Sequence, residues 1–161
     1  MNACQPLAVV LLANKFKMAT AESCTGGLIA AACTDLAGSS DWFERGFVSY
    51  ANQAKAEMLG VDARLITKHG AVSEQVARAM AQGALQHSAA QVSVAVTGVA
   101  GPGGGSADKP VGTVWFAWGL PSGLTSEVQH FEGDRAAVRA ATVQHALARL
   151  VALLQDLKTS Q

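Results

Sequence analysis

The chain has 161 residues, a length typical of one domain, and we expect residues 1–161 to fold as one. Half of the residues are apolar and 15% are charged, which excludes intrinsic disorder. Twelve Lys and Arg balance twelve Asp and Glu, so nothing in the composition favours binding to nucleic acid or to an anionic membrane. The low charge and three tryptophans (Trp42, Trp115 and Trp118) predict surface hidden between subunits, in a homodimer or larger assembly.

The three cysteines, Cys4, Cys24 and Cys33, follow no metal-binding or disulfide spacing, and we expect neither a metal nor a cofactor. The apolar segment 7–13 lacks a preceding basic stretch and is too short to span a bilayer. These features predict reduced thiols and a cytoplasmic location.

Hydrophobic periodicity and turn residues predict alternating helices and strands in the first half of the chain. The expected order is a helix at 5–16, a buried strand at 18–23, a helix at 28–38 that Gly38 ends, a strand at 42–52 and a helix at 53–60. Each helix would cover a face of the sheet that the strands form.

The second half begins with the clearest amphipathic pattern and ends with a long helix. The expected order is a helix at 71–90 capped by Ser73, a strand at 91–98, a glycine-rich loop at 100–110, a hairpin of 112–120 and 124–131, and a helix at 134–157. This order predicts an α/β fold, a three-layer α/β/α sandwich on a mixed, mostly parallel sheet of about five strands.

Ligands of such sheets bind at the carboxyl ends of the parallel strands. Three loops leave predicted strand ends, after Ser23, after Tyr50 and after Thr97. We expect a site where these loops converge.

The strongest local motif is AESCTGG at 21–27, a serine between a strand and a glycine-rich helix start. Backbone N–H groups at such a turn can bind an anion or a developing oxyanion, and glycines let a ligand come close. An ordinary turn in which Ser23 or Thr25 caps the helix is the alternative. The G-x-S-x-G motif of α/β-hydrolases is absent.

A serine nucleophile needs a base, and no acidic partner lies near any of the four histidines in the sequence. A desolvated lysine is the other option, and Lys55 follows Tyr50 at the next strand-to-helix junction. The pattern by itself equally describes a solvated surface lysine.

Two other arrangements carry less weight. Ser106 and Lys109 form a literal S-x-x-K, but in a glycine-rich loop rather than on a helix. Cys24 adjoins Ser23 and is an alternative nucleophile, although a buried thiol is usually inert.

The loop VTGVAGPGGG at 96–105 matches no standard phosphate-binding motif, and the P-loop pattern is absent. So many glycines favour a substrate cradle over a flexible link. Arg135 and Arg139, at the start of the last helix, are candidate phosphate ligands, with simple helix-start chemistry around Asp134 as the alternative.

Together these segments resemble the CinA C-terminal domain family, the nicotinamide-mononucleotide amidases. The matching stretches cover about residues 18 to 150: ATAESCTGG, GFVSYANQAKAEMLGV, HGAVSEQVARAMAQGA, AVTGVAGPGGGSADKPVGTV and GDRAAVRAATVQHAL. Family members often carry an additional N-terminal domain, for which this chain has no room, so it resembles the stand-alone form.

The resemblance implies hydrolysis of nicotinamide mononucleotide to nicotinate mononucleotide and ammonia, in pyridine nucleotide salvage. The family's serine, lysine and tyrosine fall on Ser23, Lys55 and Tyr50. We expect Ser23 to attack the amide carbon while Lys55 takes its proton, directly or through Tyr50.

The remaining site residues are expected to bind substrate. Backbone N–H groups of the AESCTGG motif and of the end of the strand at 91–98 would stabilise the oxyanion. These residues are Cys24, Thr25, Gly26, Gly27, Thr97 and Gly98. The ribose phosphate would lie against Gly101, Gly103, Gly104 and either Lys109 or Arg135.

Two alternatives stay open. One is a nucleotide-binding or regulatory module without turnover, although such a module needs neither Ser23 nor Lys55. The other is a serine amidase that acts on another carboxamide, such as free nicotinamide or a different pyridine nucleotide.

Overall fold

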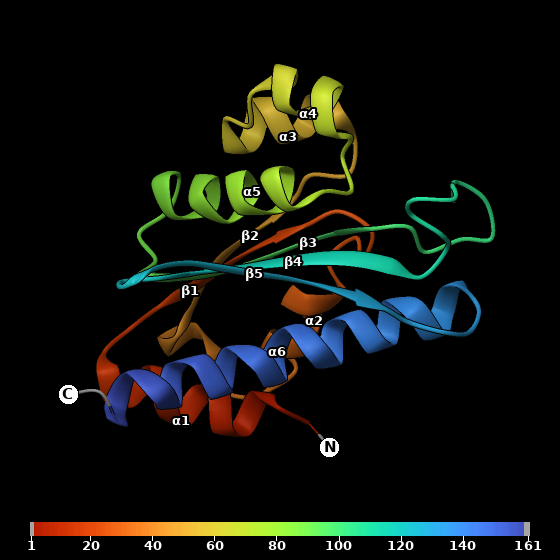
Figure 1. The fold of residues 1–161 in the computed structure, drawn as a ribbon. Coiled ribbons are helices and arrows are strands. Elements are labelled where there is room, and N and C mark those ends of the chain that lie inside the picture. Colours follow the sequence, from red (N-terminus) through yellow and green to blue (C-terminus); the bar gives the residue numbers. More distant parts are fainter. Residues whose placement is uncertain (1, 160–161) are drawn as a thin grey trace.

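The structure, a computed structural model, describes residues 2–159, the last two by their backbone only, and places a five-stranded sheet between two layers of helices (Figure 1). The element order is α1 (Cys4–Asn14), β1 (Met18–Glu22), α2 (Leu28–Thr34), the 3-10 turn η1 (Ser39–Asp41), β2 (Phe43–Val48), α3 (Asn52–Leu59), α4 (Ala63–His69), α5 (Glu74–Gln86), β3 (Val92–Gly98), β4 (Thr113–Leu120), β5 (Gly123–His130) and α6 (Arg135–Thr159).

The strand order across the sheet is β2-β1-β3-β4-β5. β1 pairs in parallel with β2 and β3, whereas β4 is antiparallel to both β3 and β5. The sheet is therefore mixed, and β4 alone runs against the other strands. This confirms the predicted α/β sandwich. Because β2, β1 and β3 are adjacent and parallel, their carboxyl ends lie at one edge of the sheet.

The two faces of the sheet carry side chains of different size. Toward α3, α4 and α5 the strands present small residues, Ala19, Ala21, Ala95 and Ala117. Toward α1, α2 and α6 they present large ones, among them Val92, Val94, Val96, Phe116 and Trp118. The small side chains on this face let α5 pack closely against the sheet. The Ser93 hydroxyl donates a hydrogen bond to the Ala81 carbonyl on α5 at 2.8 Å.

Three expected boundaries were wrong. The helix expected at 28–38 ends at Thr34, and Gly38, with φ of +86°, precedes η1 instead. The helix expected at 71–90 covers only Glu74–Gln86, although Ser73 caps it as predicted by accepting from the Val76 N–H. The strand expected at 42–52 ends at Val48.

The sequence analysis missed α4 entirely. Its start has a capping signal, since the Asp62 carboxylate accepts from the Arg64 N–H at 2.9 Å. Gly70 follows its last residue. The helix is only seven residues long, too short for a clear periodic pattern.

Two apolar features of the sequence belong to the core. α6 is long and apolar enough to span a membrane by length and composition, yet its apolar side chains, such as Val138, Leu150 and Leu154, are buried inside the fold. Trp42 and Trp118 are also buried within the chain. These two tryptophans therefore do not supply the subunit surface that they were expected to provide.

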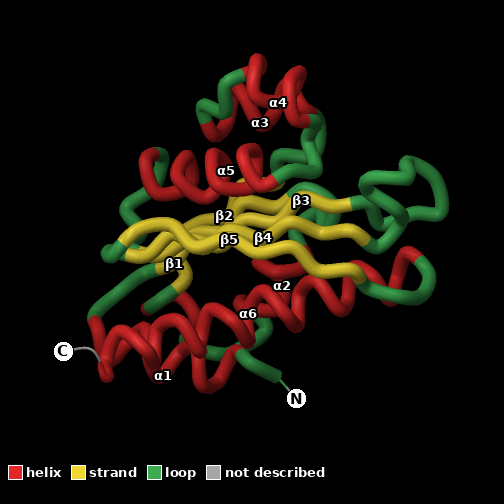
Figure 2. Tube along the Cα trace, viewed as in Figure 1, coloured by secondary structure: helices red, strands yellow, loops and turns green. Residues whose placement is uncertain are grey.

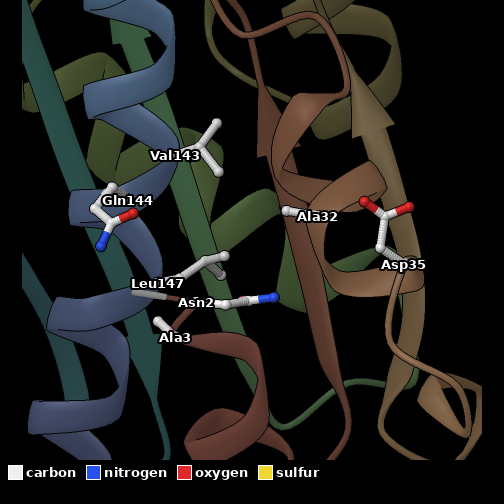
Figure 3. A pocket seen from close by; sticks show the side chains of 7 residues that line it. All are labelled: Asn2, Ala3, Ala32, Asp35, Val143, Gln144 and Leu147. Carbon is white, nitrogen blue, oxygen red and sulfur yellow. The ribbon is translucent and has the colours of Figure 1, made fainter.

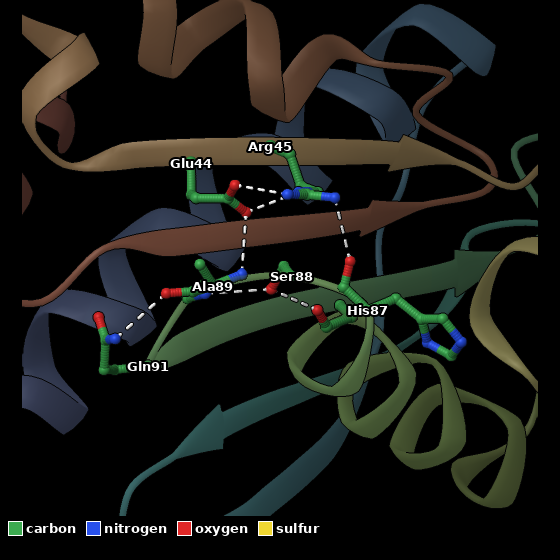
Figure 4. Close-up of polar contacts among 8 residues, drawn as sticks. Glu44, Arg45, His87, Ser88, Ala89 and Gln91 are labelled. Carbon is green, nitrogen blue, oxygen red and sulfur yellow. Dashed lines mark hydrogen bonds and ion pairs between the residues drawn. The ribbon is translucent and has the colours of Figure 1, made fainter.

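At the edge of the sheet where β1 and β3 begin, polar contacts join β2 to the turn after α5 (Figure 4). Arg45 pairs with Glu44 and donates to the His87 carbonyl at 3.2 Å, while Glu44 accepts from the Ala89 N–H. These contacts are structural and lie at the edge opposite the strand carboxyl ends.

Candidate active site

A cavity of about 260 Å³ lies where the loops after β1, β2 and β3 converge, as the sequence predicted. The loop between β3 and β4 extends beyond the same edge of the sheet (Figure 2). The lining residues are Ser23, Cys24, Tyr50, Val72, Gly98, Val99, Ala100, Gly101, Gly103, Gly104 and Arg135.

The fold places Ser23 directly after β1, whose five residues are all buried. The Ser23 N–H donates to the Val96 carbonyl of β3 at 3.2 Å, which extends the parallel pairing by one residue. The Ser23 carbonyl accepts from the Gly26 N–H at 3.0 Å. Ser23 is therefore fixed through its main chain, with its hydroxyl at the cavity.

Lys55 lies on α3 and is buried, with 1% of its surface exposed. Its Nζ is 3.1 Å from Ser23 Oγ and donates to the Tyr50 carbonyl at 2.9 Å. The structure thus brings together a hydroxyl and an amine separated by 32 residues in the sequence.

Burial lowers the pKa of the Lys55 amine below its ordinary value of 10.5, against a smaller opposing effect of Cys24. Desolvation disfavours the ammonium form, and no carboxylate forms an ion pair with Lys55 among the residues that the structure describes. A neutral amine has a lone pair that can accept the Ser23 proton. This arrangement can activate a serine nucleophile.

The side chain of Tyr50 points toward the other side of the cavity. Its hydroxyl accepts from Arg135 at 3.1 Å, and Arg135 also donates to the Gly101 carbonyl at 2.9 Å. Lys55 contacts Tyr50 through the main-chain carbonyl alone. The expected relay through Tyr50 stays a prediction, and in this structure the Tyr50 hydroxyl hydrogen-bonds to Arg135 rather than to Lys55.

β3 ends at Gly98, which lines the cavity, and the glycine-rich loop adds Gly101, Gly103 and Gly104. Gly101 and Gly104 have φ of +85° and +87°, a conformation that favours glycine. Lys109, the other expected phosphate ligand, does not line the cavity. Its Nζ donates to the His69 carbonyl at the end of α4 at 2.7 Å, so Lys109 attaches the loop to that helix.

Four other expected binding residues lie beside the cavity rather than in its lining. The Thr25 and Thr97 hydroxyls are used internally, since Thr25 donates to Glu22 and Thr97 donates to the Ala71 carbonyl. Gly26 and Gly27 form the turn into α2 with φ of +58° and +108°. They shape the loop of residues 23–27, which holds the candidate nucleophile Ser23 and is called the nucleophile loop below.

Cys24 lines the cavity but differs from Ser23 in its chemistry. Burial raises the pKa of its thiol to about 11, so little thiolate exists near neutral pH. Among the described residues, the Lys55 amine hydrogen-bonds to the Ser23 hydroxyl and not to this thiol. The alternative nucleophile is therefore disfavoured.

The sequence analysis missed Glu22, whose carboxylate is completely buried at the end of β1. It accepts from the Thr25 hydroxyl at 2.5 Å and from the N–H groups of Ile29 and Ala30 at 2.8 and 3.0 Å. It therefore joins the nucleophile loop to the first turn of α2. A charged residue in an otherwise small and apolar strand was the signal that could have found it.

Arg139, also a candidate phosphate ligand in the sequence, has internal hydrogen-bond partners. It does not line the cavity as a phosphate ligand would. Its guanidinium donates instead to two main-chain carbonyls of the nucleophile loop, Cys24 at 3.1 Å and Thr25 at 3.2 Å.

A second cavity of about 320 Å³ lies between α1, α2 and α6 (Figure 3). Its lining residues are Asn2, Ala3, Ala32, Asp35, Val143, Gln144 and Leu147. Asp35 is the one ionisable side chain among them, so this cavity has no nucleophile and base together. None of the four histidines is among the described residues that line either cavity.

Comparison with known proteins identifies the family. The model of the CinA C-terminal domain matches residues 3–154. The chain belongs to the CinA C-terminal domain family. This confirms the resemblance seen in the sequence motifs.

Two curated CinA-family relatives differ in length. The chain is 54% identical over 142 residues to a CinA-like protein of Akkermansia muciniphila, covering 88% of the chain and 34% of that protein. It therefore spans about a third of that longer relative. It is 52% identical over 142 residues to nicotinamide-nucleotide amidohydrolase PncC of Escherichia coli, covering 87% of the chain and 86% of that protein.

Solved structures of the CinA family have the same fold. The competence/damage inducible protein CihA from Agrobacterium tumefaciens is 48% identical, with a TM-score of 0.90 over 94% of this chain and 93% of that chain. A CinA superfamily protein from Escherichia coli is 41% identical, with a TM-score of 0.92 over 94% of this chain and 88% of that chain.

Proposed function

We propose that the chain is a single amidase domain that hydrolyses nicotinamide mononucleotide to nicotinate mononucleotide and ammonia. The observation that carries the proposal is the buried contact between Lys55 Nζ and Ser23 Oγ at 3.1 Å. Relatives of similar length that are named nicotinamide-nucleotide amidohydrolase support the choice of substrate.

The reaction begins with Ser23 Oγ attacking the carboxamide carbon while neutral Lys55 takes the hydroxyl proton. The Lys55 ammonium then returns the proton to the amide nitrogen, the carbon–nitrogen bond breaks, and ammonia leaves. Water attacks the resulting acyl-enzyme, Lys55 takes its proton, and the ester bond to Oγ breaks. Ser23 recovers its proton and nicotinate mononucleotide leaves.

Arg135 is proposed to bind the substrate phosphate. It lines the cavity, carries a fixed positive charge and is oriented by Tyr50 and by the Gly101 carbonyl. Salvage of a cytoplasmic nucleotide would place the protein in the cytoplasm. A homodimer or larger assembly is also proposed, and light scattering of the purified protein would test it.

The test is ammonia release from nicotinamide mononucleotide by purified protein in the presence of EDTA, which excludes a contaminating metal enzyme. We expect turnover in the wild type, none in Ser23→Ala or Lys55→Ala, and most of it in the matched control Cys24→Ala. Turnover that survives in Ser23→Ala would overturn the mechanism.

The same assay with other substrates separates the remaining alternatives. Slower turnover of nicotinamide riboside would show that the phosphate contributes. Binding of the nucleotide without ammonia release would identify a binding module, and release from another carboxamide alone would identify a different amidase.

A further inference from the structure

Arg139 contacts the nucleophile loop but does not line the cavity. It lies one helical turn after Arg135 on α6, and its Nε and Nη2 donate to the consecutive carbonyls of Cys24 and Thr25. A guanidinium has a planar fork of donors that suits such paired acceptors. The contact therefore fixes two successive peptide units of the loop.

Fixing these carbonyls also fixes the direction of backbone N–H groups. In a planar trans peptide unit the N–H points opposite to the carbonyl. The Cys24 carbonyl is bound to Arg139, so the direction of the Thr25 N–H is set. The Ser23 carbonyl accepts from the Gly26 N–H, which sets the direction of the Cys24 N–H in the same way.

The N–H groups of Cys24 and Thr25 donate to no other residue among residues 2–159, although both residues are buried. A buried backbone donor without a partner is costly and calls for an explanation. An oxyanion formed on the carbon that Ser23 attacks would supply an acceptor.

Two further contacts support this arrangement. Glu22 holds the Thr25 hydroxyl and the start of α2, so the loop is fixed from the strand as well as from α6. In the described part of the chain no carboxylate forms an ion pair with Arg139. Its positive charge therefore stays available to a negative charge that develops near the loop.

We propose that Arg139 is a positioning residue that aligns the Thr25 N–H group as a donor to the tetrahedral oxyanion, beside the Cys24 N–H group that the contact between Ser23 and Gly26 orients. This inference rests on the proposed amidase function. The role of Arg139 differs from that of Arg135, because Arg139 acts on the transition state and not on the bound phosphate. Loss of one oxyanion donor typically lowers kcat by about 100- to 1000-fold.

The test compares Arg139→Gln and Arg139→Lys with Arg149→Gln, a control on the same helix that removes an arginine paired with Glu127. We expect kcat for nicotinamide mononucleotide to fall by roughly tenfold or more in Arg139→Gln with little change in KM. Arg139→Lys should recover part of the loss, and Arg149→Gln should behave as wild type. If Arg139→Gln does not fold, Arg139→Lys carries the test.

Inhibition by pyridine-3-boronic acid gives a readout that a smaller folded fraction would not change. Addition of Ser23 Oγ to boron yields a tetrahedral anion, so its inhibition constant should rise in step with the fall in kcat/KM. The dissociation constant of nicotinate mononucleotide should stay unchanged.

Three outcomes would contradict the inference. Unchanged kcat/KM and boronate inhibition in Arg139→Gln would overturn the positioning role. Weaker nucleotide binding with unchanged kcat would make Arg139 a phosphate ligand. Wild-type protein that releases no ammonia would overturn the amidase function itself, and the inference with it.

Discussion

Gly83 on α5 faces the main-chain carbonyl of Leu59 on α3 so closely that a Cβ at position 83 would lie 2.1 Å from that oxygen. Leu59 is the last residue of the helix that carries Lys55. The position of the amine beside Ser23 therefore depends on the absence of a side chain on a different helix.

We expect Gly83→Ala to push α3 away from α5, because the clash is with backbone and a rotamer change cannot relieve it. Overpacking of this kind costs about 1–3 kcal/mol. For a domain of this size the midpoint of thermal unfolding should fall by roughly 2–4 °C per kcal/mol. Ammonia release should fall further than the lost folded fraction explains, as Lys55 moves away from Ser23. Gly103→Ala, where a Cβ meets nothing within 4 Å, is the control for stability.

Burial of Lys55 makes stability depend on pH. Its pKa is lowered in the folded protein, so between that value and 10.5 the unfolded chain binds more protons. The contribution of Lys55 to stability is therefore unfavourable at neutral pH and improves as the pH rises through this interval. Relative to Lys55→Met, the wild type should gain stability between pH 7 and pH 10 in denaturant titrations. Lys68→Met, at an exposed position, is the matched control variant, and an equal gain relative to both variants would contradict the prediction.

Glu22→Gln should destabilise the nucleophile loop. The carboxylate accepts hydrogen bonds at both oxygens, and an amide nitrogen cannot accept from the Ala30 N–H or the Ile29 N–H. A buried donor left without its partner costs about 1–3 kcal/mol. Calorimetry should show a lower unfolding temperature and the activity assay a lower kcat. If Glu22→Gln changes neither the unfolding temperature nor kcat, the start of α2 does not need the negative charge of Glu22.

Lys109→Met should loosen the glycine-rich loop from α4 by removing the hydrogen bond to the His69 carbonyl. Because Gly101, Gly103 and Gly104 line the cavity, substrate binding should weaken more than the chemical step. A loss of about 1–2 kcal/mol corresponds to a KM raised roughly 5- to 30-fold. Steady-state kinetics of Lys109→Met would measure the rise in KM, with Lys68→Met as the control variant. A fall in kcat without a rise in KM would contradict this role of Lys109.

The sequence predicted the fold through patterns that are local. Alternation of apolar helices and strands, followed by a hairpin, was sufficient for the layered α/β architecture. It also located Ser23, Tyr50 and Thr97 near strand ends, because the carboxyl ends of parallel strands meet at one edge. The short helix α4 was missed because seven residues show no clear period.

Only the tertiary structure determined how the side chains are used. Whether Lys55 is a solvated or a buried amine depends on how α3 packs against α5, and that packing involves Leu59 and Gly83, which lie far apart in the sequence. Likewise, Arg135 and Arg139 are indistinguishable by residue type, yet one lines the cavity and the other binds the nucleophile loop. Periodicity specifies which face of an element is buried, whereas hydrogen-bond partners and desolvation are set by contacts between distant segments.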